Sequence, residues 1–168
     1  NKKSDLVGFK MGLHAEYTCD RELLEKASEL IHKYKAPVYV HMSETETEVK
    51  ECFDRYGKSP VALFDELGLW DFGGSIYHGV WCDDEDMEIL KKRNISVISN
   101  PGSNTKLASG IAPISKYLEK GIIVGLGTDG PSSNNCLDMF REMFLVTGLA
   151  KLKERDPKAV AADEVLKM

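Results

Sequence analysis

Three of the four histidines in this sequence, and one aspartate, follow short runs of strand-forming residues. The histidines are His14, His41 and His78, and the aspartate is Asp129. Glu44 comes three residues after His41, so an imidazole and a carboxylate stand one short turn apart. Imidazole and carboxylate groups could hold a divalent metal ion and carry a proton beside it. These five residues are therefore the candidates for metal binding and proton transfer.

Neutral imidazole and carboxylate ligands suit Zn²⁺ or another borderline divalent metal. A metal with an open position binds water and lowers the pKa of that water toward ~7. A carboxylate within reach can take the released proton and give it to a leaving group. The residue types therefore predict metal-assisted hydrolysis. The alternative is that the histidines are unrelated and each satisfies only local contacts. His32, which falls inside a predicted helix, is expected to be a surface or packing residue.

The elements that must position these residues alternate between strand and helix patterns. This alternation predicts an α/β fold with parallel strands and right-handed helical crossovers. The strand runs are apolar on both faces, which is typical of buried parallel strands. Because the site of a parallel α/β fold lies at the carboxyl ends of its strands, the candidate residues should meet there. The expected strands are 8–14, 38–41, 75–78, 95–99 and 122–126, and the expected helices are 21–33, 45–56, one from Pro60, 83–93, 113–120, 135–149 and one from Asp156.

Two polar segments and two aromatic residues leave alternatives open. Residues 100–102 have a turn signature, and residues 103–110 read as a loop that either faces a substrate or is ordinary surface. Residues 131–135 could hold a substrate or cap the next helix through Ser133 or Asn134.

Tyr17 and Trp81 could stack on an aromatic base, although core packing is the commoner use of such residues.

The composition is that of a globular protein and excludes several function classes. Hydrophobic residues make up 42% of the 168 residues and charged residues 29%, with a net charge of -5. No stripe of Lys and Arg predicts nucleic-acid binding, and no apolar run is long enough to predict a membrane span. The four cysteines are widely spaced and predict reduced thiols in a cytoplasmic protein.

Five motifs give the chain a resemblance to the amidohydrolase superfamily, within it the 5-methylthioadenosine/S-adenosylhomocysteine deaminases and their chlorohydrolase-like relatives. The motifs cover nearly the whole chain in the order that the family shows. They are HAEYTCD (14–20), HMSETETEVKE (41–51), HGVW (78–81), NPGSNTKLASGIAPI (100–114) and GTDGPSSNNCLDMFREM (127–143).

The resemblance implies a role for each candidate residue. His41 and Asp129 resemble metal ligands for Zn²⁺ or another divalent metal such as Fe²⁺, and Asp129 also helps to deprotonate the bound water. Glu44 resembles the residue that carries a proton to the purine ring nitrogen, and His78 the histidine that orients the attacking water. His14 resembles a contact to the nucleoside, so that His14, Glu44 and Asp129 are the expected substrate contacts. The implied reaction is attack of the activated water on the adenine ring carbon with loss of ammonia.

The same resemblance implies that residues 1–168 form a single partial TIM (β/α)8 barrel domain, from the fourth to the eighth strand–helix unit. The HxH metal-ligand pair of the first family strand and the family's β-sandwich have no counterpart here, and the chain begins with Asn1. We therefore expect a piece of a longer protein whose two-ligand site binds metal weakly or not at all. Two alternatives remain: an amidohydrolase acting on guanine or a chloro-triazine, or a non-catalytic partial barrel that could form homo-oligomers.

Overall fold

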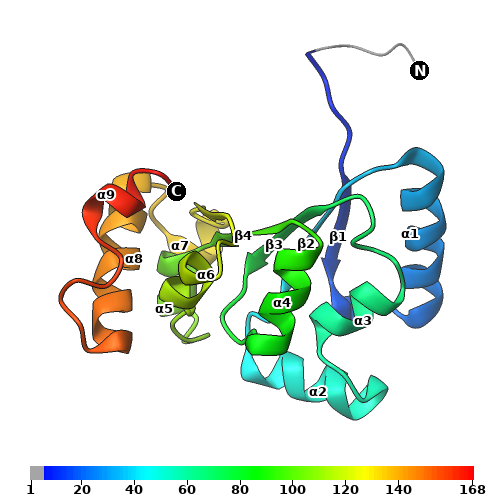
Figure 1. Ribbon diagram of the computed structural model, residues 1–168, viewed down its shortest axis with the longest axis horizontal. Helices are drawn as coiled ribbons and strands as arrows, with labels where there is room; N and C mark the ends of the chain where they lie inside the picture. The colour runs from blue at the N-terminus through cyan, green and yellow to red at the C-terminus, as the bar shows by residue number, and fades with distance from the viewer. Residues whose placement is uncertain (1–5) are drawn as a thin grey trace.

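A computed structural model describes residues 6–168, and residues 1–5 of the predicted domain lie outside the described residues. The described chain contains a five-stranded parallel sheet in which each strand pairs with the next one along the chain (Figure 1). The predicted parallel α/β architecture is confirmed. The strands are β1 (Met11–Ala15), β2 (Val38–Met42), β3 (Gly74–His78), β4 (Ile95–Ser99) and β5 (Val124–Leu126).

Helices fill every connection between neighbouring strands, as parallel pairing requires. Five of the helices begin at a side chain that accepts a hydrogen bond from the first-turn backbone: Asp20, Thr45, Ser59, Asp83 and Asp138. The helical elements are η1 (Glu16–Thr18), α1 (Arg21–Tyr34), α2 (Glu46–Tyr56), α3 (Pro60–Glu66), α4 (Asp84–Lys92), α5 (Pro101–Lys106), α6 (Ile114–Glu119), α7 (Pro131–Asn134), α8 (Met139–Glu154) and α9 (Ala162–Val165).

The two faces of the sheet differ in burial. In β2, Val38 and Val40 are fully buried and join a core shared with helix residues such as Ile31. Tyr39 and His41 point to the opposite face and are only partly buried. The expectation that the strands are buried on both faces is therefore wrong for β2. The less covered face is the one that carries His41.

One predicted loop and two predicted helix starts are also wrong. Residues 101–106 form α5 and are not a loop. Pro101 starts this helix, and Gly102 is needed inside it because a Cβ there would lie 2.4 Å from Glu142 Oε1. Helix α8 begins at Met139 rather than at residue 135, because Asn135 has left-handed backbone (φ 67°) and ends α7. The last helix, α9, begins well after Asp156.

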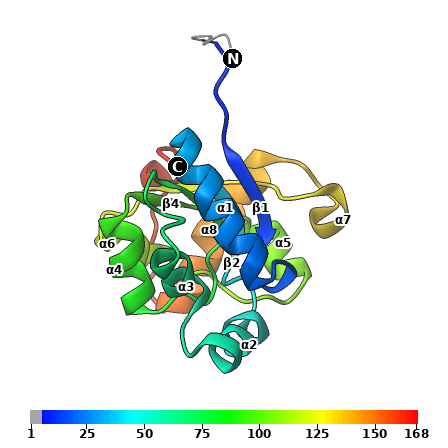
Figure 2. The ribbon, with the colours of Figure 1, turned by 90° about the vertical axis from the view of Figure 1, so that its right-hand side faces the viewer.

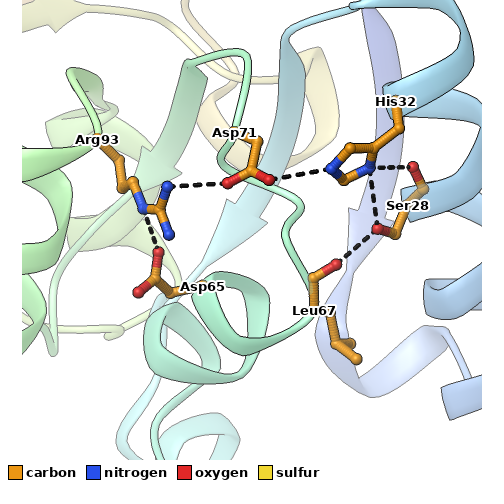
Figure 3. A network of polar contacts seen from close by, with 6 residues as sticks. All are labelled: Ser28, His32, Asp65, Leu67, Asp71 and Arg93. Atoms are coloured by element: carbon orange, nitrogen blue, oxygen red, sulfur yellow. Dashed lines mark hydrogen bonds and ion pairs between the residues drawn. The ribbon is translucent and has the colours of Figure 1, made fainter.

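At the amino ends of β2, β3 and β4, a network of polar contacts joins three helices (Figure 3). His32 Nε2 lies 3.0 Å from Asp71 Oδ2, and Arg93 donates to both Asp71 (2.8 Å) and Asp65 (2.5 Å). Ser28 Oγ donates to the carbonyl of Leu67 at 2.6 Å. His32 thus lies at the surface, as predicted, and links α1 to the segment that leads into β3.

The chain before β1 and helix α8 expose large apolar side chains. Residues 6–10 extend away from the rest of the described chain in both views (Figures 1 and 2), and Phe9 is 67% exposed. On α8, Phe140 is 80% exposed and Phe144 is 73% exposed.

No helix within residues 6–168 is long and apolar enough to cross a membrane. The four cysteines are free, and burial raises the pKa of Cys52 and Cys82 to about 12.

Candidate metal centre

Three of the candidate residues come together at the carboxyl ends of the strands. His41 lies on β2, His78 ends β3, and Asp129 follows β5. Each offers one ligand atom, and these atoms all lie within 4.8 Å of one another. His78 (φ 71°) and Asp129 (φ 57°) both have left-handed backbone, which is uncommon outside glycine. The surrounding structure must stabilise these two conformations, as is frequent at functional sites.

His41 is held by a backbone carbonyl. Its Nδ1 lies 2.7 Å from the carbonyl oxygen of His14 on the neighbouring strand β1. A carbonyl oxygen can only accept, so Nδ1 must carry the hydrogen and Nε2 keeps its lone pair in the neutral ring. Such a contact on the far ring nitrogen is common for histidines that bind metals.

His78 is buried and is oriented in a similar way. Its Nδ1 lies 2.8 Å from Asn104 Oδ1 on α5, which leaves Nε2 facing the candidate site. Nε2 lies 3.7 Å from Glu44 Oε2. The rings of His78 and His41 are stacked with their centroids 5.5 Å apart.

Asp129 accepts hydrogen bonds from two serine hydroxyls. Ser103 Oγ and Ser133 Oγ lie 2.7 Å and 2.6 Å from the same oxygen, Oδ2. Partial burial raises the pKa of Asp129, but the bonds from Ser133 and Ser103 and the nearby His78 outweigh it. The pKa therefore lies below its usual value, and the carboxylate is ionised and ready to bind a cation.

Glu44 and His14 lie at the edge of the cluster. The side chain of Glu44 is 18% exposed, and Ser109 Oγ donates to its Oε1 at 3.4 Å. His14 is exposed, with its ring centroid 5.2 Å from that of His41 and its Nδ1 2.9 Å from Thr18 Oγ1. All five candidate residues thus occupy one region.

The structure narrows the alternatives left open for the polar segments and aromatic residues. Ser133 and Asn134 do not cap α8, whose cap is Asp138. Ser133 contacts Asp129 instead, and Asn134 donates to the carbonyl of Thr128 at 2.7 Å. Tyr17 and Trp81 are 51% and 40% exposed, so neither is a core residue.

The residues that hydrogen-bond to the site side chains, or to the backbone next to them, were not predicted from the sequence. Asn104 and Ser109 lie in the segment read as a loop. Two buried carboxylates, Glu48 and Glu142, are bonded to backbone N–H groups next to site residues. The spacing Thr45-x-x-Glu48 at a helix start is a capping-box signature and could have drawn attention to Glu48.

The donor set fits a divalent metal ion. Two imidazoles with free Nε2 atoms and one ionised carboxylate are the groups that zinc prefers, and zinc in catalytic sites has three protein ligands and an open position. His78 joins the expected ligands His41 and Asp129 as a candidate third donor.

The amidohydrolase family matches residues 1–168. This chain belongs to the amidohydrolase family. Among its relatives, the 5-methylthioadenosine/S-adenosylhomocysteine deaminase of Thermococcus onnurineus is 44% identical over 165 residues, which are 98% of this chain and 39% of that protein. The 5'-deoxyadenosine deaminase of Methanopyrus kandleri is 45% identical over 97% of this chain and 38% of its own length.

A zinc-bound crystal structure of an adenosine deaminase from Xanthomonas campestris superposes with a TM-score of 0.91 at 33% identity. The match covers 98% of this chain and 38% of that one. The chain thus spans about two fifths of the length of the amidohydrolase deaminases it matches.

Proposed function

We propose that this chain is part of a metal-dependent hydrolytic deaminase of adenine nucleosides, of the S-adenosylhomocysteine, methylthioadenosine or adenosine type. The observation that carries the proposal is the cluster of His41, His78 and Asp129, with the Glu44 carboxylate 3.7 Å from His78 Nε2. The deaminase names and the bound zinc of the relatives support it.

The five strand–helix units would be the fourth to eighth units of a (β/α)8 barrel, and residues 1–168 would be one partial barrel domain. Two features support this arrangement. The face of β2 that carries His41 is only partly buried, as expected where a barrel interior has lost its opposite wall. Phe140 and Phe144 on α8 expose apolar surface that further barrel elements would cover.

Bound Zn²⁺ or Fe²⁺ would lower the pKa of a water molecule and so supply a nucleophile at neutral pH. His41 Nε2 and Asp129 would hold the ion, with Ser103 and Ser133 fixing the orientation of the carboxylate. His78 Nε2 faces the same space and would orient the attacking water.

Glu44 would carry a proton from that water to the purine ring nitrogen, which makes the neighbouring ring carbon more open to attack, and the second proton of the water would go to the departing amino group, which leaves as ammonia. His14, exposed beside His41, would contact the nucleoside. A small nucleoside-type substrate is therefore the expected partner.

The test uses the full-length protein that carries this chain, loaded with zinc. It is incubated with S-adenosylhomocysteine, methylthioadenosine and adenosine, and the ultraviolet shift toward inosine products and the released ammonia are measured. Turnover of at least one compound is expected. Absence of turnover with all three would contradict the proposal, and faster turnover of guanine or a halo-triazine would reassign the substrate.

We also propose that residues 1–168 by themselves are non-catalytic, because they span about two fifths of the length of their deaminase relatives and contain no counterpart of the family's HxH ligand pair. Metal analysis and an activity assay on these residues alone test this statement. Stoichiometric zinc together with measurable deamination would contradict it, and size-exclusion chromatography would show whether the exposed apolar surface leads to self-association.

A further inference from the structure

The loop between β2 and α2 is held by one buried carboxylate. Glu48, in the first turn of α2, is 4% exposed. Its Oε1 accepts from the backbone N–H of Ser43 and its Oε2 from the backbone N–H of Glu44, both at 2.8 Å. Burial raises the pKa of Glu48, but each of its two oxygens accepts a short bond from a different backbone N–H, so the pair constrains two successive residues of the loop.

The carboxylate of Glu48 does more than cap its own helix. Thr45 is the N-cap of α2 and its hydroxyl accepts from the N–H of Glu48 at 3.2 Å. In an ordinary capping box the glutamate side chain would return to the N–H of the cap residue. Here it reaches one and two residues further back, to the loop that carries Glu44.

The held loop has an unusual backbone. Ser43 is fully buried and left-handed (φ 51°), a conformation that is uncommon for a non-glycine residue. Its carbonyl accepts from the N–H groups of Val80 and Trp81, both at 2.9 Å. Bonds on both sides of Ser43 therefore fix the direction in which the chain leaves β2 and enters Glu44.

We infer that Glu48 is a positioning residue for the proposed proton transfer, because it fixes the backbone from which the Glu44 carboxylate reaches His78. This inference rests on the proposed function. A carboxylate that carries a proton must lie within hydrogen-bond reach of its partner, and a displacement of about 1 Å can cost 10²-fold in rate. Glu48 itself contacts no substrate or reacting atom and acts only through Glu44.

The first experiment compares Glu48→Gln and Glu48→Ala with Glu51→Gln in the zinc-loaded full-length protein. Glu51 lies on the same helix and is 56% exposed, so it controls for loss of a charge from α2. We expect kcat to fall on the order of 10-fold for Glu48→Gln and 100-fold for Glu48→Ala, with KM and zinc content little changed. The Glu51→Gln variant should match the unaltered protein.

A double-mutant cycle separates positioning from general damage. In a Glu44→Gln background the proton carrier is already lost, so adding Glu48→Ala should change the residual rate by less than about 3-fold. A full further loss in that background, or a loss of zinc, would overturn the inference.

Hydrogen exchange provides a readout that does not depend on activity. The amides of Ser43 and Glu44 should exchange faster in Glu48→Ala than in Glu51→Gln, while peptides from β4 should be unchanged. Unchanged exchange at residues 43–44 would overturn the inference. If the unaltered protein deaminates nothing, the proposed function fails, while faster exchange would still support the hold of Glu48 on this loop.

Discussion

The two ends of the sheet use polar side chains in opposite ways. At the carboxyl ends, His78 and Asn104 are buried and make hydrogen bonds to neutral groups or to backbone. At the amino ends, His32, Asp71 and Arg93 form partly exposed ion pairs (Figure 3). The carboxyl end therefore fixes side chains in place, whereas the amino end connects helices to one another.

The sharpest contrast comes from the same substitution at each end. Asp129→Asn in the full-length protein should lower deamination by about 10³-fold or more, because an amide is a poor zinc ligand and cannot take a proton. Asp71→Asn should leave the rate nearly unchanged. Both rates are measured with saturating substrate, together with zinc content. Equal losses in the two variants would remove the proposed division of roles.

The second largest effect is expected at Glu142, a fully buried carboxylate at the carboxyl end. It accepts from the N–H of Gly102 and from Asn134 Nδ2, both at 2.7 Å. Glu142→Gln keeps the shape but turns an amide donor toward one of these donors, which should cost about 1–3 kcal/mol of the free energy of unfolding.

The consequence of Glu142→Gln should extend to the candidate metal centre, because Gly102 and Asn134 adjoin the two serines that bind Asp129. Thermal unfolding and the rate of deamination should therefore fall together. The matched control is Glu154→Gln, which removes an exposed charge from the same helix, α8. A variant that loses stability without losing activity would separate this carboxylate from the site.

The sequence predicted the sheet well and the supports of the site poorly. The runs that end in His41 and His78 are short, rich in β-branched or aromatic residues, and preceded by Pro37 and Gly74, so the local pattern sufficed. The segment that forms α5 resembles a loop in sequence, because Pro101 and Gly102 have a turn signature. Glu142, 40 residues away, leaves no room for a side chain at residue 102, which explains a glycine inside this helix. No local sequence pattern reports such a contact.

A smaller effect is expected at the amino end from Arg93→Met, which keeps much of the apolar side chain but removes the ion pairs with Asp65 and Asp71. Partly exposed pairs contribute little individually, so the loss should be about 1 kcal/mol or less. It should shrink as salt is added, because salt screens exposed charges. Thermal unfolding at low and high salt measures this, and a lowered deamination rate would argue that the two ends are coupled.

The smallest effect is a pH dependence at His32. The hydrogen bond to the carbonyl of Ser28 and the contact with Asp71 raise the pKa of His32 above its usual 6.5, and Arg93 faces the same aspartate. A raised pKa in the folded state means that the protonated ring adds stability below about pH 6.5 and loses it as the pH rises through the folded value. The melting temperature of the unaltered protein should therefore exceed that of His32→Gln most at pH 5.5 to 6, by roughly a degree or two, and least at pH 9. A gap that is constant or grows with pH would show that the protonated ring contributes nothing to the network, which would then depend on Arg93 alone.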